Sequence, residues 1–136
     1  MGTIKEHLTT IDNKEYSCKT FPATEGLVLL PKLIALMGDK VANLIFYTND
    51  EQQEELIANP KTGIAIMVQI SERAAENDGL LIIKEVLKYT RCKQCRVGDA
   101  EVEASVYETF DHHFAGAYGH LFKVFSWVAR VSFENP

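Results

Sequence analysis

Aromatic residues near the C-terminus follow a helical spacing, and this pattern constrains the fold more than any other feature of the sequence. Six of them lie within eighteen positions: Phe110, Phe114, Tyr118, Phe122, Phe125 and Trp127. Because most recur every three or four residues, they form one wide apolar stripe on helical segments. We expect helices over residues 105–114 and 118–131, with Gly116 and Gly119 allowing a bend between them. The stripe must be buried in a core or against a partner, and both alternatives are open.

The composition predicts a single domain over residues 1–136. The chain is 46% apolar and 24% charged, which argues against intrinsic disorder and allows a sizeable core. Its longest apolar runs, residues 26–31 and 79–83, are too short to cross a membrane. The formal net charge of −5 argues against a nucleic-acid partner, because phosphate binding needs a basic face. We therefore expect neither a membrane nor a nucleic acid as partner.

The N-terminal region has the pattern of a β-hairpin. Residues 3–10 and 14–21 fit two short strands, and Asp12, Asn13 and Lys14 between them are typical of a turn. Residues 1–10 lack the apolar segment of a secretory signal. An isolated hairpin is marginally stable in water, so this one must pack on the rest of the chain or pair with another chain.

The remaining residues, 23–136, favour helices. A helix over residues 24–37 would be closed by Gly38, with Pro31 either in the first turn of a shorter helix or kinking a longer one. Further helical segments are expected at residues 41–47, 51–58, 64–75 and 80–89, with Asn59 and Pro60 beginning the third of these. Residues 90–103 are the most polar stretch and indicate a loop, with at most a short strand at 100–104. The expected fold class is α+β, mainly α: a hairpin (1–22) followed by a compact bundle of about five to six helices (23–136).

Two cysteines in the polar stretch, Cys92 and Cys95, form a CxxC motif. A structural zinc site needs four ligands. The others would have to come from His112 or His113, His120 and Cys18. A redox dithiol would begin a helix after a strand, whereas this motif follows a helix. We expect two reduced thiols on a loop and no metal or cofactor, with Cys92 and Cys95 as weak metal candidates.

Motifs for catalysis are missing from the sequence. It contains no phosphate-binding GxxxxGK, no GxGxxG and no HExxH. The adjacent His112 and His113 would point about 100° apart on a helix, so they cannot chelate one ion together. The acidic residues between 50 and 55 fit a solvated first helical turn. We therefore expect a protein that is not an enzyme.

Two segments carry a family resemblance. They are residues 16–38, YSCKTFPATEGLVLLPKLIALMG, and residues 110–133, FDHHFAGAYGHLFKVFSWVARVSF. Both resemble the small tail assembly chaperones of long-tailed bacteriophages, in the Phe-Pro-Ala turn before an apolar helix and in the acidic-His-Phe-Ala-Gly turn near the end. The chain departs from the family pattern at Ala117, where Arg or Lys is common, and at Ser132, where Asn is common.

The resemblance implies a function that rests on binding. It implies that the chain binds the tape measure protein, a long helical chain that sets tail length, or other tail proteins, in the cytoplasm of the bacterial host. Bound copies would keep that protein soluble and guide assembly of the tail tube. We expect the partner-binding residues in the aromatic stripe and on the 27–37 helix face: Phe110, Phe114, Phe122, Phe125, Trp127, Leu30 and Leu33.

Two further questions are open from the sequence. The chain could instead be a structural baseplate or tail adaptor protein that stays in the virion tail, with an edge strand of the hairpin pairing with a neighbouring subunit. Homo-oligomerisation and a longer product made by ribosomal frameshift are also open, since neither leaves a mark in these residues.

Overall fold

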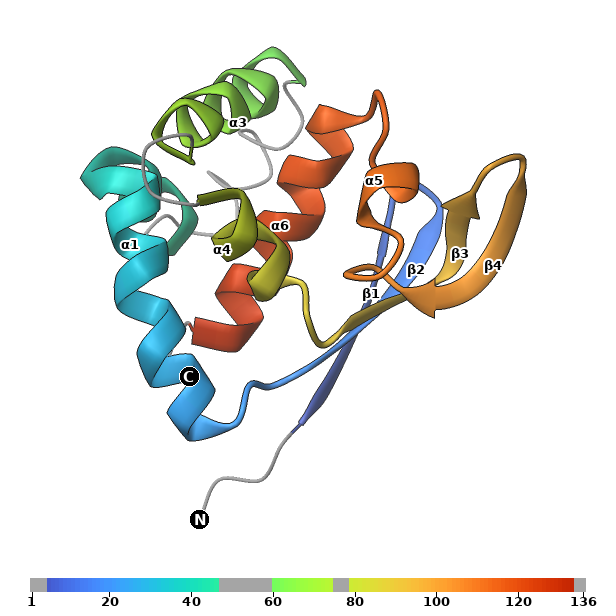
Figure 1. The fold of residues 1–136 in the computed structure, drawn as a ribbon, viewed down its shortest axis with the longest axis horizontal. Coiled ribbons are helices and arrows are strands. Elements are labelled where there is room, and N and C mark those ends of the chain that lie inside the picture. Colours follow the sequence, from blue (N-terminus) through green and yellow to red (C-terminus); the bar gives the residue numbers. More distant parts are fainter. Residues whose placement is uncertain (1–4, 47–59, 75–78, 134–136) are drawn as a thin grey trace.

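A computed structural model describes residues 5–46, 60–74 and 79–133, which fold into a sheet beside a layer of helices (Figure 1). Four strands form one antiparallel sheet in the order β1-β2-β3-β4. Their bounds are β1 Glu6–Ile11, β2 Lys14–Lys19, β3 Thr90–Val97 and β4 Ala100–Ser105. Asp12 and Asn13 take positive φ angles of 49° and 67° at the β1–β2 turn, a conformation that Asn and Asp tolerate. The predicted N-terminal hairpin is therefore present.

The expected fold class was wrong in its second half. The chain after residue 22 is not a helical bundle, because the strands β3 and β4 interrupt the helices and pair with the N-terminal hairpin through β2. Cys18 of β2 lies opposite Thr90 of β3. The segment predicted as a loop is thus the second half of the sheet. The fold is α+β with strands and helices interspersed.

Strand β3 was not predicted from the sequence because most of its residues are polar. Arg91 and Lys93 are exposed on the outer face, while Cys92 and Cys95 point inward and are buried. An irregularity in the pairing with β4, between Cys92 and Cys95, breaks the simple alternation of inward and outward residues. The strand therefore has neither the apolar content nor the strict period of two that sequence patterns detect.

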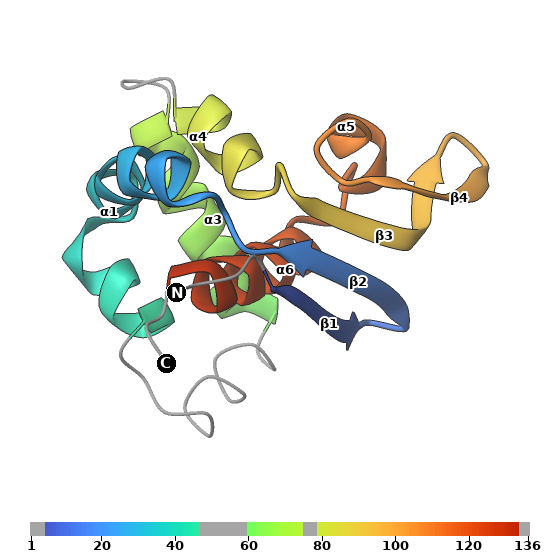
Figure 2. The same ribbon diagram turned by 90° about the horizontal axis from the view of Figure 1, so that it is seen from below.

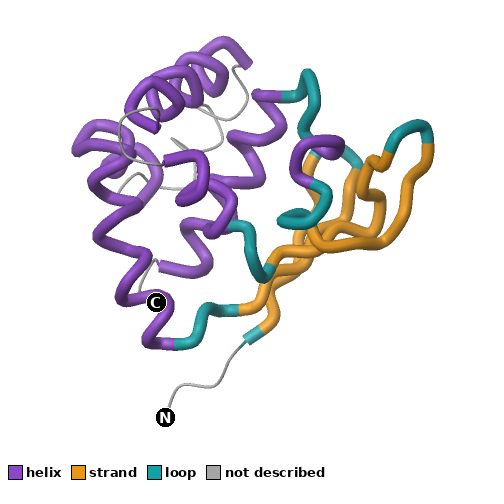
Figure 3. Tube along the Cα trace, in the orientation of Figure 1, coloured by secondary structure: helices purple, strands orange, loops and turns teal. Residues whose placement is uncertain are grey.

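The four longer helices lie together at one side of the sheet, and the short α5 lies against β3, as Figure 3 shows. Their bounds are α1 Ala23–Phe46, α3 Pro60–Ala74, α4 Gly79–Val86, α5 Phe110–His113 and α6 Tyr118–Phe133. Gly38, at φ 77°, interrupts the helical backbone of α1, which confirms the predicted stop, and Pro31 lies inside the longer helix. The expected 105–114 helix is reduced to the short α5. The expected 51–58 helix and the Asn59 cap lie outside the described residues.

Helix α6 occupies the centre of the molecule (Figure 2). It contacts α1, α3, α4 and strand β1. Phe125, Val124 and Val128 of α6 are fully buried, and they share the core with Leu33 of α1 and Val86 of α4. Burying each such side chain contributes roughly 1.5–3 kcal/mol. Because α6 touches every large helix and the sheet edge, the two halves of the molecule share one core.

An aromatic cluster fixes the start of α1 against the end of α6. Phe21 stacks on Phe133 with ring centroids 5.5 Å apart and meets Tyr89 edge to face at 5.1 Å. The Tyr89 hydroxyl donates a hydrogen bond to the Glu25 carboxylate at 2.8 Å.

No helix in the described part of the chain has the length and hydropathy to cross a membrane.

One buried hydroxyl in α6 gives a test of this core. The Ser126 side chain is 1% exposed, and its oxygen has no hydrogen-bond partner among the described residues. We expect Ser126→Ala to raise the free energy of unfolding by about 1 kcal/mol, because the variant removes an unsatisfied polar group. Urea denaturation measures the change. Ser132→Ala on the same helix is the control. It should not raise the free energy of unfolding, because the Ser132 hydroxyl already has a hydrogen-bond partner, the Cys18 sulfur, at 3.9 Å. A loss of stability in Ser126→Ala would contradict the prediction.

Candidate functional site

The outer face of α1 is apolar although it faces solvent. Leu27, Val28 and Ile34 are 73%, 56% and 40% exposed, and the exposed Pro31 lies between them on the same face. The opposite face carries the buried Leu29, Leu33 and Leu36. Exposed apolar patches on folded proteins are often interaction surfaces, which makes this face a candidate site. We name Leu27, Val28 and Ile34 the α1 surface.

Helix α4 packs beside α1 and also has exposed apolar side chains. Leu80 and Leu81 of α4 are 57% and 58% exposed. An open groove of about 380 Å³ lies between the two helices. Its lining residues are Phe21, Thr24, Glu25, Val28, Leu29, Glu85 and Lys88. The apolar floor with charged margins is suited to an amphipathic partner helix.

The residues predicted as anchors lie mostly inside the protein. Five of them are buried in the core: Phe110, Phe114, Phe122, Phe125 and Leu33. Trp127 and Leu30 are partly buried. The helical period identified which residues share a stripe, but α1 is apolar nearly all round, so the sequence did not show which of its faces is outside. The binding role of the seven residues stays a prediction.

A chain of hydrogen bonds crosses the interior between the sheet and α6, and sequence reasoning missed it. The Arg96 amide donates to Nδ1 of His113 at 3.1 Å. His113 Nε2 therefore carries the proton and donates to the Tyr16 hydroxyl at 2.7 Å. Tyr16 in turn donates to His120 Nε2 at 2.5 Å, and His120 Nδ1 donates to the Asp12 carboxylate at 2.9 Å. With all donors pointing the same way along this series, each side chain in it has a hydrogen-bond partner.

Burial dominates the titration of this hydrogen-bond chain. Burial, with a smaller contribution from the nearby His120, lowers the pKa of His113 from 6.5 to about 4. Burial also lowers the pKa of His120, although the Asp12 carboxylate opposes the shift. The pKa of the Tyr16 hydroxyl is raised, again chiefly by burial. All three side chains are therefore neutral near pH 7, as the hydrogen-bond directions require.

The two cysteines of the CxxC motif lie beside this chain, on a strand and not on the expected loop. Cys92, Cys95 and His113 bring their ligand atoms within 4.8 Å of one another, and all three side chains are buried. The Cys95 pKa is lowered mainly by a hydrogen bond from the Cys92 thiol, whose own pKa is raised by that bond. Cys18 and His112 lie outside the cluster. His112 is exposed.

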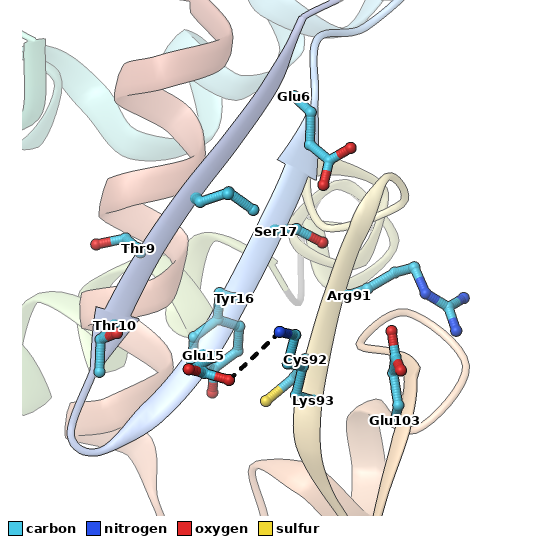
Figure 4. Close-up of a pocket in the computed structure, with 11 residues that line it drawn as sticks. Glu6, Thr9, Thr10, Glu15, Tyr16, Ser17, Arg91, Cys92, Lys93 and Glu103 are labelled. Atoms are coloured by element: carbon cyan, nitrogen blue, oxygen red, sulfur yellow. Dashed lines mark ion pairs between the residues drawn. The ribbon is translucent and has the colours of Figure 1, made fainter.

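The other face of the sheet carries an open groove of about 530 Å³ (Figure 4). Side chains of both charges line it, among them Glu6, Glu103 and Arg91. Lys93 pairs with Glu15 at 3.6 Å across β2 and β3. Because the opposite charges are paired or interspersed, the groove presents no single-sign field for a charged ligand.

Comparison with known protein families gives a match that covers nearly the whole chain. A family model described as phage tail assembly chaperone protein, TAC, matches residues 12–136. Neither the curated proteins nor the solved structures gave a match. The matched range includes every described helix and the strands β2, β3 and β4. It confirms the resemblance seen in residues 16–38 and 110–133.

Replacing Tyr16 tests the energetic weight of the buried hydrogen-bond chain. We expect Tyr16→Phe to lower the free energy of unfolding by about 3 kcal/mol, because it leaves the buried His113 and the partly buried His120 each with one ring nitrogen without a partner. Urea denaturation measures the loss, in a buffer with a metal chelator so that no bound ion contributes to stability. Tyr118→Phe is the matched control, since Tyr118 is 60% exposed and should change stability by less than about 0.5 kcal/mol. Equal losses in the two variants would show that the buried chain contributes nothing.

Proposed function

Because the chain belongs to the phage tail assembly chaperone family, we propose that it binds the tape measure protein, keeps it soluble and guides assembly of the tail tube. Membership of the family implies a protein that acts in the host cell during tail assembly, with tail proteins as its partners. The family also implies a non-catalytic protein. The identity of the partner and the surface that binds it are our proposal.

The observation that carries the proposal is the exposed α1 surface. A long helical chain that has not yet been enclosed by its tube exposes apolar residues and tends to aggregate. Leu27, Val28 and Ile34 offer apolar area that such a helix can cover, in the manner of a helix laid on a groove. Burying three such side chains stabilises a complex by a few kcal/mol at most, before the entropic cost of association.

Weak binding by each copy suits a chaperone that later leaves. Many copies bound along one long chain would together hold it in solution, although each contact is weak. Tube subunits could then displace the copies one at a time. The net charge of −5 would keep the coated chain from associating with others.

The seven residues predicted from the sequence have a secondary place in the proposal. Trp127 and Leu30 are partly exposed and can touch a docked helix directly. Phe110, Phe114, Phe122, Phe125 and Leu33 are buried and would meet a partner only after the helices separate. In the closed fold they contribute to the hydrophobic core.

The alternative, a structural baseplate or tail adaptor protein, has one observation in its favour. Strand β1 is an edge of the sheet, and its Leu8 is 74% exposed. An edge strand can pair with a strand of a neighbouring subunit. Quantitative mass spectrometry of mature virions and of infected-cell lysate separates the two functions. A chaperone is abundant in lysate and absent from virions, whereas a fixed copy number per virion would support the structural alternative.

Charged substitutions on the α1 surface test the proposed function. We expect the double variant Leu27→Glu/Ile34→Glu to lower the soluble fraction of the co-expressed tape measure protein at least about tenfold, since both glutamates would have to be desolvated in the complex. The soluble fraction is measured by sedimentation and immunoblot. Leu8→Glu is the matched control, because it replaces an equally exposed leucine on the sheet.

Thermal unfolding of the three proteins shows first that the variants keep the fold. Wild-type solubility of the tape measure protein with the double variant would contradict the proposal. Loss with Leu8→Glu alone would move the binding surface to β1. Analytical ultracentrifugation of the free chain covers one further alternative, since a homo-oligomer closed by the α1 surface would dissociate in the double variant.

A further inference from the structure

The cluster of Cys92, Cys95 and His113 lies apart from the α1 surface and has no part in the proposed function. Its three ligand atoms lie within 4.8 Å of one another, and the side chains are 0–1% exposed. It is the one group of this kind among the described residues. We propose that these three side chains bind one Zn²⁺ ion, which fastens β3 to α5.

The donor set fits zinc. Two thiolates and an imidazole form a soft, borderline set that zinc prefers over magnesium or calcium. In a tetrahedral site with Zn–S of about 2.3 Å and Zn–N of about 2.0 Å, ligand atoms lie roughly 3.3–3.8 Å apart. The three atoms would therefore have to approach by no more than about 1.5 Å. Two thiolates also neutralise the ion, so the buried site needs no further counter-charge.

The backbone brings the three donors together from two elements, β3 and α5. The irregular pairing between Cys92 and Cys95 turns both side chains of the CxxC motif to the inner face of β3. The short helix α5 packs against β3 and ends at His113. Just before α5, the Thr109 hydroxyl donates to the Ser105 carbonyl at 2.9 Å, and its oxygen lies 3.4 Å from the Cys95 sulfur.

Hydrogen bonds prepare His113 to be a ligand. Its Nε2–H group donates to Tyr16, which leaves the lone pair on Nδ1. In the present structure the Arg96 amide donates to that lone pair, and an ion bound at Nδ1 would replace this one hydrogen bond. Tyr16, His120 and Asp12 then form the outer partners that orient the imidazole, as such partners do around zinc-bound histidines.

The fourth position is assigned to a solvent molecule. His120 and Asp12, the next ligand-type side chains along the hydrogen-bond chain, are bonded to each other at 2.9 Å. Asp12 is also paired with Lys123 at 2.9 Å. Three protein ligands and a solvent molecule complete a tetrahedron. Both cysteines bind the ion as thiolates, so affinity should fall as pH decreases.

Metal titration of the full chain tests the inference with the ion alone. The protein is stripped with a chelator under reducing conditions and titrated with Zn²⁺ or Co²⁺. We expect one ion per chain, the visible bands of tetrahedral Co²⁺ with a thiolate charge-transfer band, and a melting temperature that rises with Zn²⁺ concentration. Cys92→Ser and Cys95→Ser should weaken binding by more than the roughly 10–100-fold that loss of an outer partner costs.

Cys18 supplies the matched control, because it is equally buried but lies outside the cluster. Cys18→Ser should bind Zn²⁺ as the wild type does, and Tyr16→Phe should bind it roughly 10–100-fold more weakly. Should the serine variants fail to fold, alkylation of the wild type provides a second measurement. Zn²⁺ should slow alkylation of Cys92 and Cys95 much more than that of Cys18, whose rate should fall only as far as the ion stabilises the whole fold.

Three outcomes would overturn the inference. They are a wild-type Co²⁺ complex without the thiolate band, equal loss of binding in Cys18→Ser, and a stable Cys92–Cys95 disulfide in the protein as it is isolated from the host. None of these measurements involves a tail protein, so their failure leaves the proposed function untouched, and the converse also holds.

Discussion

The burial of α6 is the interaction on which the rest of the structure depends. Its side chains fill the space between α1, α3 and α4, and its N-terminal turn reaches the sheet through His120. Neither layer could bury its own apolar face without this helix, because the sheet offers mainly Tyr16, Cys18, Cys92 and Cys95 as inner residues. A core already completed by α6 leaves the outer face of α1 uncovered, and this is the face we assign to a partner.

The sequence predicted those parts of the fold that have a local cause. The turn at Asp12 and Asn13 and the helix stop at Gly38 follow from backbone preferences of single residues. Strand β3 has no such local signal in its sequence. Its inward-facing residues include two cysteines, and the alternation of inward and outward side chains is broken between Cys92 and Cys95. Its pairing with β2 depends on residues more than seventy positions away.

The candidate sites show the same limit of local patterns. Periodicity placed Phe122, Phe125 and Leu33 on apolar stripes, but only the fold shows that these stripes face inward. The CxxC motif and His113 were each visible in the sequence, yet their meeting depends on α5 packing against β3. The family match, in contrast, needed only the order of residues, and the two quoted segments were sufficient to suggest it.

The pairing of β2 with β3 also has a consequence in time. Cys18 pairs with Thr90, which lies 72 positions later in the chain. At a synthesis rate of 5–20 residues per second, Thr90 is therefore made roughly 4–14 s after Cys18. Over that interval the inner edge of β2 offers unpaired backbone groups, and an isolated hairpin is marginally stable. This member of the tail assembly chaperone family thus passes through a stage in which its own strand edge is exposed, and the rate at which its message is translated sets how long that stage lasts.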